Sequence, residues 1–174
     1  MTKLQTTGVK VPVNGKSKLV IFSDLHLGNG GSRDDFFHNG AMMQKILEDY
    51  YYSKDYTLIL NGDIDELLRF SQTTVEKKWE RLYQLFGNFH KKKALYKIFG
   101  NHDISHSKPR KSHSPLPVHE SVTLEHTAGD LLVFHGHQAG WMCSEFANRA
   151  IAFILKYFAT PLGIKNYLVA HDSK

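Results

Sequence analysis

Four short apolar runs in this chain are each followed, within two residues, by an aspartate, an asparagine or a histidine. The runs cover residues 18–23, 57–61, 95–99 and 131–134, and each has the length and content of a buried strand. Strands that alternate with helices and end in a hairpin predict a layered α/β sandwich with a mixed sheet. Ligands bind such sheets beyond the carboxyl ends of the strands, so the residues after each run are the first candidates for function.

Two segments between the strands have helical spacing. The first follows Ser32 and is expected to present one apolar face: Met43, Ile46, Leu47 and Tyr50. The second is a single predicted helix, in which Thr73 and Glu76 have the spacing of a capping box. Residues 118–126 alternate between apolar and polar, which predicts one strand with a wet face, and residues 9–13 predict a short strand.

Composition narrows the class of protein. The 174 residues are 41% hydrophobic and 22% charged, which is typical of one globular domain. The net charge of +5 favours anionic partners without selecting among them. Cys143 is the one cysteine and cannot form an internal disulfide, and residues 1–18 lack the apolar stretch of a secretory signal. We therefore expect a cytoplasmic protein.

The residues that follow the strands are potential metal ligands. They are Asp24, His26, Asp63, Asn101 and His135, and most of them lie beside a glycine. Hydrolysis of a phosphoester needs a nucleophile at neutral pH and neutralisation of the phosphoryl charge, and two metal ions bridged by a carboxylate supply both. Asp63 suits the bridging position. Mixed imidazole, carboxylate and amide ligands favour Mn, Fe or Zn.

Each of these motifs has an ordinary structural explanation when it is taken alone. Asp-x-His arises by chance, Gly-Asp after a strand is often a turn, and Asn-His-Asp can cap a helix. The set is harder to explain in this way, because its members occur in order and each follows a strand. The sequence therefore predicts a metal site with two divalent ions, of which Mn is favoured.

These motifs resemble the signatures of the calcineurin-like metallophosphoesterase family. The matching segments are Asp24-Leu25-His26, Gly62-Asp63-Ile64-Asp65-Glu66, Gly100-Asn101-His102-Asp103 and His135-Gly136-His137. The resemblance runs from about residue 18 to residue 137 and implies an α/β/β/α sandwich. It implies that Asp24 and His26 hold the first metal, that Asp63 bridges, and that Asn101 and His135 hold the second.

The resemblance also implies two catalytic roles. His102 would lie beside the scissile phosphate, where it would stabilise charge or protonate the leaving oxygen. Asp103 would orient His102 through a hydrogen bond. His137 is not usually a ligand in this family, and we expect it to be part of the loop structure.

The fifth family signature, Gly-His-x-His, does not follow His137. An alternative assignment takes His135-Gly136-His137 as the fifth signature and His119 or His126 as the histidine of the fourth signature, but it fits the family pattern less well. Residues 146–158 instead form an apolar helical pattern, similar to the start of the helical insertion of UDP-diacylglucosamine pyrophosphatases. Those enzymes have Arg where His102 stands. We expect a C-terminally incomplete enzyme, with a polar lead-in at residues 1–17, a phosphoesterase core at 18–140 and an apolar helical segment at 141–174.

Three functions are compatible with these features. The first is a metal-dependent hydrolase of phosphoester or pyrophosphate bonds, with a metal-activated water as nucleophile and a phosphorylated small molecule or lipid-linked substrate. The second is a non-catalytic scaffold, or an inactive fragment, that binds a protein partner. Nucleic-acid cleavage ranks lowest, because no platform of aromatic and basic residues is visible. Residues 146–158 also suggest contact with the inner face of a membrane. The basic loop at 104–117, which contains Lys108, Arg110 and Lys111, suggests either phosphate binding or a solvated loop.

Overall fold

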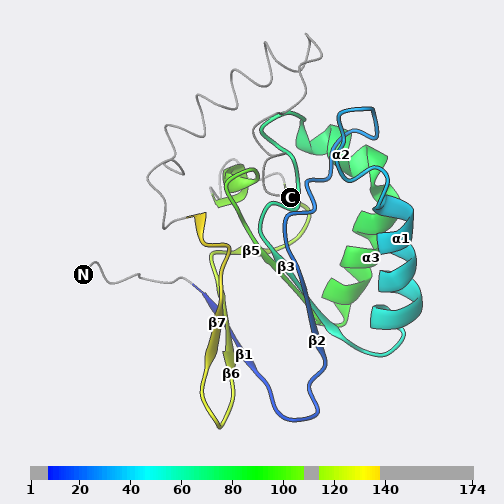
Figure 1. Ribbon diagram of the computed structural model, residues 1–174. Coiled ribbons are helices and arrows are strands. Elements are labelled where there is room, and N and C mark those ends of the chain that lie inside the picture. Colours follow the sequence, from blue (N-terminus) through cyan, green and yellow to red (C-terminus); the bar gives the residue numbers. More distant parts are fainter. Residues whose placement is uncertain (1–7, 108–113, 138–174) are drawn as a thin grey trace, which may run out of the picture.

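Two β-sheets packed face to face form the centre of the structure, a computed structural model that describes residues 8–107 and 114–137 (Figure 1). The first sheet is parallel, in the order β2-β3-β4-β5, and its strands are Leu19–Phe22, Thr57–Asn61, Leu95–Ile98 and Val118–His119. The second sheet has the order β1-β6-β7, and its strands are Val9–Pro12, Val122–Glu125 and Leu131–Val133. Because β1 and β6 are parallel while β6 and β7 are antiparallel, this sheet is mixed. The predicted α/β sandwich with a mixed sheet is confirmed.

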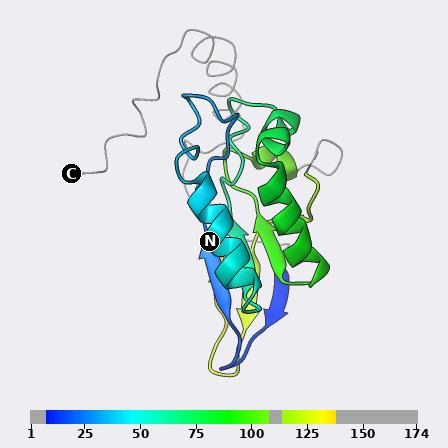
Figure 2. The same ribbon diagram turned by 90° about the vertical axis from the view of Figure 1, so that its right-hand side faces the viewer.

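Helices cover the outer face of the parallel sheet. They are α1 at Gly40–Ile46, which continues into the π-helical turn η1 at Leu47–Tyr52, then α2 at Gln72–Lys78 and α3 at Glu80–Lys91. Figure 2 shows α1 and α3 side by side across this face. A 3₁₀ turn, η2, lies at Ile104–Ser107. Within residues 8–107 and 114–137, none of the helices is long and apolar enough to cross a membrane. The predicted apolar segment at 141–174 lies outside the described residues, as do residues 108–113 of the predicted basic loop at 104–117.

Strand β3 contributes to both hydrophobic cores. Leu58 and Leu60 pack in the core beneath the helices, while Ile59, between them in the strand, belongs to the core between the two sheets. All three are fully buried, and they are joined by Phe86 from α3 on one side and Val122 from β6 on the other. A strand that is apolar on both faces is expected at the centre of such a sandwich. The loop after β3 therefore starts from a strand that is buried on both faces.

The first predicted helix differs from expectation in its start and in its buried face. It begins at Gly40, and of the four expected core residues only Leu47 is fully buried, whereas Ile46 and Tyr50 are exposed. The change to π-helical geometry at Leu47 alters the 3.6-residue period for the residues that follow, Tyr50 among them. Tyr51 and Tyr52 pack against the core instead.

The second predicted helix is divided in two. Ser71, not Thr73, is the N-cap of α2, and its hydroxyl accepts a hydrogen bond from the backbone N–H of Thr74. Trp79 separates α2 from α3 with non-helical dihedral angles, and its indole N–H donates to the carbonyl of Gly28 at 3.1 Å. The assignment of Thr73 and Glu76 to a capping box was therefore wrong. Trp79, at the break between the helices, connects them to the loop after β2.

Residues 118–126 form two strands rather than one. After β5, the chain leaves the parallel sheet at residues 120 and 121 and enters the other sheet as β6. The carbonyl of Ser121 accepts a hydrogen bond from the backbone N–H of Val9, which starts the pairing with β1. Alternation in the sequence could not reveal this crossing, because both halves of the segment are genuine strands.

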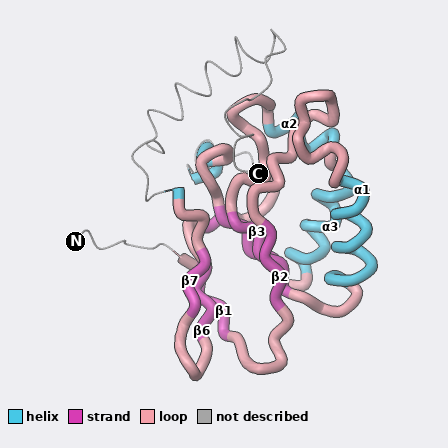
Figure 3. Tube along the Cα trace, in the orientation of Figure 1, coloured by secondary structure: helices cyan, strands magenta, loops and turns pink. Residues whose placement is uncertain are grey.

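The loops that follow β2, β3 and β7 lie at one end of the two sheets (Figure 3), and the loop after β4 meets them there, since the backbone N–H of His102 donates to Asp63. Gly62, directly after β3, lies where the loops of the two sheets meet. Its φ angle is +78°, and a Cβ atom placed on it would lie 2.4 Å from Cγ of His135, which follows β7. Glycine is therefore required here by both conformation and space.

We predict that Gly62→Ala destabilises the protein by at least about 1–3 kcal/mol, because alanine would be strained at this φ angle and would displace His135. The matched control is Gly87→Ala in α3, where a new Cβ meets nothing within 4 Å. That change should stabilise the helix by about 0.5–1 kcal/mol. Urea unfolding gives the free energy of unfolding of both variants. Equal changes of this free energy in the same direction would contradict the prediction.

Candidate metal centre

The loop that carries Asp24 and His26 is joined by backbone hydrogen bonds to the loop that carries Asp63. The N–H of Asp24 donates to the carbonyl of Gly62 at 3.1 Å, and the N–H of His26 donates to the carbonyl of Asp63 at 2.9 Å. A bridge between Leu27 and Asp65 extends the parallel pairing further. The first two motifs are thus held side by side beyond the end of the sheet, as the sequence predicted for strand ends.

Three of the predicted ligands adopt the left-handed backbone conformation. The φ angles of Asp24, His26 and Asp63 are 57°, 50° and 51°. This region is uncommon for residues with a side chain and costs about 1–3 kcal/mol for each. This backbone conformation turns all three side chains toward one rim of the sheet. Backbone strain of this kind is concentrated at functional sites.

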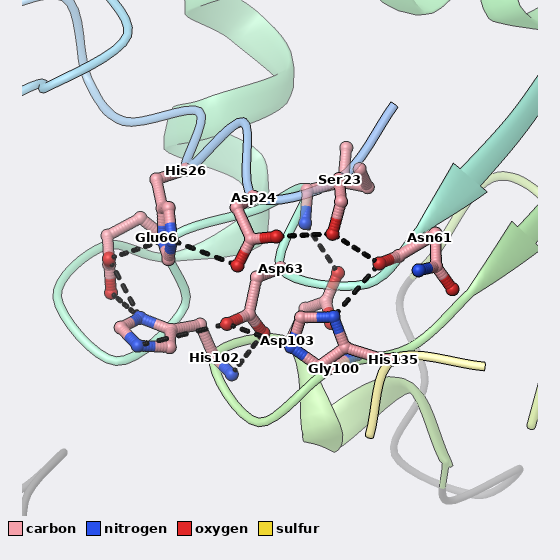
Figure 4. A network of polar contacts seen from close by, with 11 residues as sticks. Ser23, Asp24, His26, Asn61, Asp63, Glu66, Gly100, His102, Asp103 and His135 are labelled. Carbon is pink, nitrogen blue, oxygen red and sulfur yellow. Dashed lines mark hydrogen bonds and ion pairs between the residues drawn. The ribbon is translucent and has the colours of Figure 1, made fainter. Parts of the chain in front are cut away.

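The carboxylate of Asp63 lies at the centre of the cluster (Figure 4). Its Oδ1 accepts a hydrogen bond from the backbone N–H of His102 at 2.8 Å, and its Oδ2 lies 3.3 Å from Nε2 of His135. Burial raises the pKa of Asp63, but the hydrogen bond with His135 and the nearby His102 outweigh burial, so the net pKa is lowered. Asp63 is therefore an ionised carboxylate between two motifs, which is the position predicted for a bridging ligand.

The ring of His135 is oriented by the backbone. Its Nδ1 lies 2.9 Å from the carbonyl oxygen of Asn61, and since a carbonyl can only accept, the proton is on Nδ1. Nε2 consequently faces Asp63. The hydrogen bond with Asp63 is the main reason that the pKa of His135 is raised to about 9, against an opposing effect of burial. A backbone carbonyl behind one ring nitrogen is a common arrangement for a histidine that binds metal through the other.

Glu66 holds two histidines at once. Its Oε2 lies 2.9 Å from Nδ1 of His102 and 3.2 Å from Nδ1 of His26. Burial raises the pKa of Glu66, but the hydrogen bonds with His102 and His26 prevail and lower it to about 2. For His26, burial lowers the pKa, while Glu66 and the neighbouring carboxylates raise it to a value above the ordinary one.

The sequence prediction assigned Asp103 to His102, and the structure gives His102 the partner Glu66 instead. Asp103 is fully buried and accepts hydrogen bonds from the backbone N–H groups of Gly100, at 2.6 Å, and Ile64, at 3.2 Å. Its role is to connect the second and third motif loops. Burial raises the pKa of Asp103 to about 6, against the effect of the nearby Lys97. Glu66 could have been found, since it occupies the final position of the Gly-Asp-x-x-Asp/Glu signature.

The remaining predicted residues lie at the same rim. Asn101 is the third residue after the end of β4 and is half-buried. His137 is buried, and its ring centroid lies 5.5 Å from that of Phe99 and 5.6 Å from that of His135. Burial lowers the pKa of His137. His137 thus packs against its neighbours, in keeping with the structural role expected for it.

A buried ion pair lies beneath the motif loops and was not predicted. Nζ of Lys97, from β4, lies 2.5 Å from Oδ2 of Asp65, and both side chains are at most 1% exposed. The hydroxyl of Tyr83, from α3, donates to the other oxygen of Asp65. This group connects the loop after β3 to the sheet and to the helices. A lysine within an apolar run of a central strand was the available signal, because such a lysine must find a buried partner.

The residues at the rim fit divalent metal ions. Asp24, His26 and Asp63 each offer a ligand atom, and these atoms all lie within 4.8 Å of one another. Space for the cluster depends on glycine, since a Cβ on Gly100 would lie 2.1 Å from Oδ1 of Asp63. Asp65, Asp103 and His106 form a second cluster of potential ligands, but Lys97 already supplies the positive charge there.

The comparison with known families agrees with this geometry. Residues 17–171 match the family described as Calcineurin-like phosphoesterase, which covers most of the chain. No curated protein matches the sequence significantly. The chain belongs to the calcineurin-like phosphoesterase family, whose members are metal-dependent phosphoesterases.

We predict that Lys97→Met destabilises the protein by about 3–5 kcal/mol, because the change leaves the carboxylate of Asp65 buried without its counter-charge. Lys10→Met is the matched control. Nζ of Lys10 also lies 2.5 Å from a carboxylate oxygen, Oε1 of Glu125, but the side chain of Lys10 is 71% exposed. Water solvates the carboxylate in that case, so the free energy of unfolding should hardly change. Chemical unfolding that finds equal losses for the two variants would contradict the role of burial.

Proposed function

We propose that this protein hydrolyses phosphoester or pyrophosphate bonds with two bound divalent metal ions. The observation that carries the proposal is the convergence of Asp24, His26, Asp63 and His135 on one rim, with the ring of His102 beside them. Asp24, His26 and Asp63 would hold the first ion, and Asp63, Asn101 and His135 would hold the second. The bound ions would supply a nucleophilic water at neutral pH and neutralise charge on the phosphoryl oxygens. Mn is the favoured ion for this mixed ligand set.

His102 would act on the leaving group in this proposal. Its Nδ1 donates to the Glu66 carboxylate, and its Nε2 lies 4.0 Å from Oδ2 of Asp63, so the ring is directed toward the proposed metal ligands. The pKa of Glu66 is lowered to about 2, so this carboxylate is ionised and fixes the orientation of the His102 ring, from which Nε2 could pass a proton to the departing oxygen. Glu66 is a positioning residue in this scheme, since it acts through the two histidines.

The proposal also includes a position near the UDP-diacylglucosamine pyrophosphatase branch of the family. A relation to UDP-diacylglucosamine pyrophosphatases rests on residues 146–158, which lie outside the described part of the chain, and His102 replaces the Arg of those enzymes. The same residues carry the proposed contact with a membrane surface. A cytoplasmic location is also part of the proposal, and it rests on the single Cys143, which has no second cysteine for an internal disulfide.

We predict that Asp63→Asn lowers kcat/KM for bis(p-nitrophenyl) phosphate or p-nitrophenyl phosphate by at least about a hundredfold. Metal ions contribute several kcal/mol to transition-state stabilisation, and the change removes the proposed bridging charge. Bound Mn²⁺, measured by calorimetry, should also fall from two ions to one or none. Asp130→Asn, the same change at an exposed turn, is the control and should retain both ions and full activity.

A folded protein that takes up no metal and cleaves no phosphoester would contradict the proposal. That result would favour the alternative of a non-catalytic scaffold that binds a protein partner. Unchanged metal binding and turnover in Asp63→Asn would contradict it equally, because the bridging role would then be wrong.

We also predict that Mn²⁺ affinity rises with pH between 6.5 and 8.5. The pKa of His135 in the metal-free protein is about 9, chiefly because of its hydrogen bond with Asp63, so a metal must displace a proton from this ring. One displaced proton changes affinity by about tenfold per pH unit below the pKa. Calorimetry in two buffers of different ionisation enthalpy measures the released proton, and a pH-independent affinity would contradict the expectation.

A further inference from the structure

An apolar cavity opens beside the candidate metal centre. Its volume is about 430 Å³, and it lies between the loop after β2 and helix α1. The apolar part of its wall comes from Phe22, Leu25, Phe36 and Met43, with Met42 and Ile46 also in the lining. Cavities of this size, mostly apolar with a few polar groups, are typical of sites for small organic ligands.

Two residues belong to both the cavity and the proposed metal centre. Asp24 and His26 line the cavity, and they also form, with Asp63, the cluster of potential ligands. A phosphoryl group held at the metals would therefore have its ester substituent beside the mouth of the cavity. This continuity distinguishes the cavity from an isolated surface hollow.

The charges of the lining select the kind of substituent. Among the described residues that line the cavity, Asp24 and Asp35 are acidic, and His26 is the one that can carry a positive charge. A second phosphate or another anionic group would meet Asp35 without a basic partner, whereas an uncharged apolar group would bury against the aromatic and methionine side chains. Methionines adapt well to ligands of varied shape.

We propose that this cavity binds the apolar organic group of the substrate, so that the protein prefers phosphoesters with an aryl or alkyl substituent. The inference rests on the proposed hydrolase function and extends it to the substrate class. It also explains why α1 exposes apolar residues on the side of the cavity, where Met42 is 68% and Ile46 is 42% exposed.

The test compares two non-hydrolysable probes, methylphosphonate and phenylphosphonate, by calorimetry with the full chain loaded with Mn²⁺. Burial of a phenyl ring should make phenylphosphonate bind at least about tenfold more tightly. Asn39→Trp should abolish this advantage by filling the cavity. Asn39 is an exposed lining residue whose side chain makes no capping hydrogen bond, so its replacement should not disturb folding.

Ile46→Gln should reduce the phenyl advantage by about threefold or more, and Leu132→Gln is its control. Leu132 is 44% exposed, close to the value for Ile46, but it lies on β7 away from the cavity, and its replacement should change nothing. Equal affinity for the two phosphonates, or equal weakening of both by Asn39→Trp, would overturn the inference and leave the hydrolase proposal standing. Failure of both phosphonates to bind, or of Mn²⁺ to bind, would overturn both.

Discussion

The carboxylate of Asp63 connects loops that come from three different strands. Its own loop follows β3, the backbone of His102 follows β4, and the ring of His135 follows β7. The loop after β2 is fixed to the same place through the backbone bond from His26 to Asp63. The site therefore depends on β3, the strand that is buried on both faces, and a shift of that strand would move every candidate ligand.

Holding this many acidic groups in a partly buried region is costly, and the structure offsets the cost in three ways. Asp63 and Glu66 are paired with histidines, Asp103 accepts two backbone hydrogen bonds, and Asp65 is paired with Lys97. Each arrangement also connects neighbouring loops, so charge compensation and positioning are achieved by the same contacts. The strained backbone of Asp24, His26 and Asp63 is maintained because these contacts surround it.

The sequence was informative wherever a local pattern determines the structure. Apolar runs predicted the strands, and the polar residues after them identified the rim, because parallel strands end at the same edge. Where the outcome depended on contacts between distant segments, the prediction failed. The break at Trp79, whose indole N–H donates to the carbonyl of Gly28, and the passage between sheets near Ser121, which pairs with Val9, both involve such contacts. The partner of His102 was mispredicted for the same reason. Both Asp103 and Glu66 belong to the sequence motifs, and only the contacts between the folded loops determine that Glu66, not Asp103, binds His102.

A crystal structure of the Mn²⁺-loaded protein, with anomalous diffraction data, tests the central claim most directly. The account predicts two anomalous peaks within bonding reach of the Asp63 carboxylate, one beside Asp24 and His26 and the other beside Asn101 and His135. A single peak away from Asp63, peaks at the buried cluster of Asp65, Asp103 and His106, or none at all would contradict it.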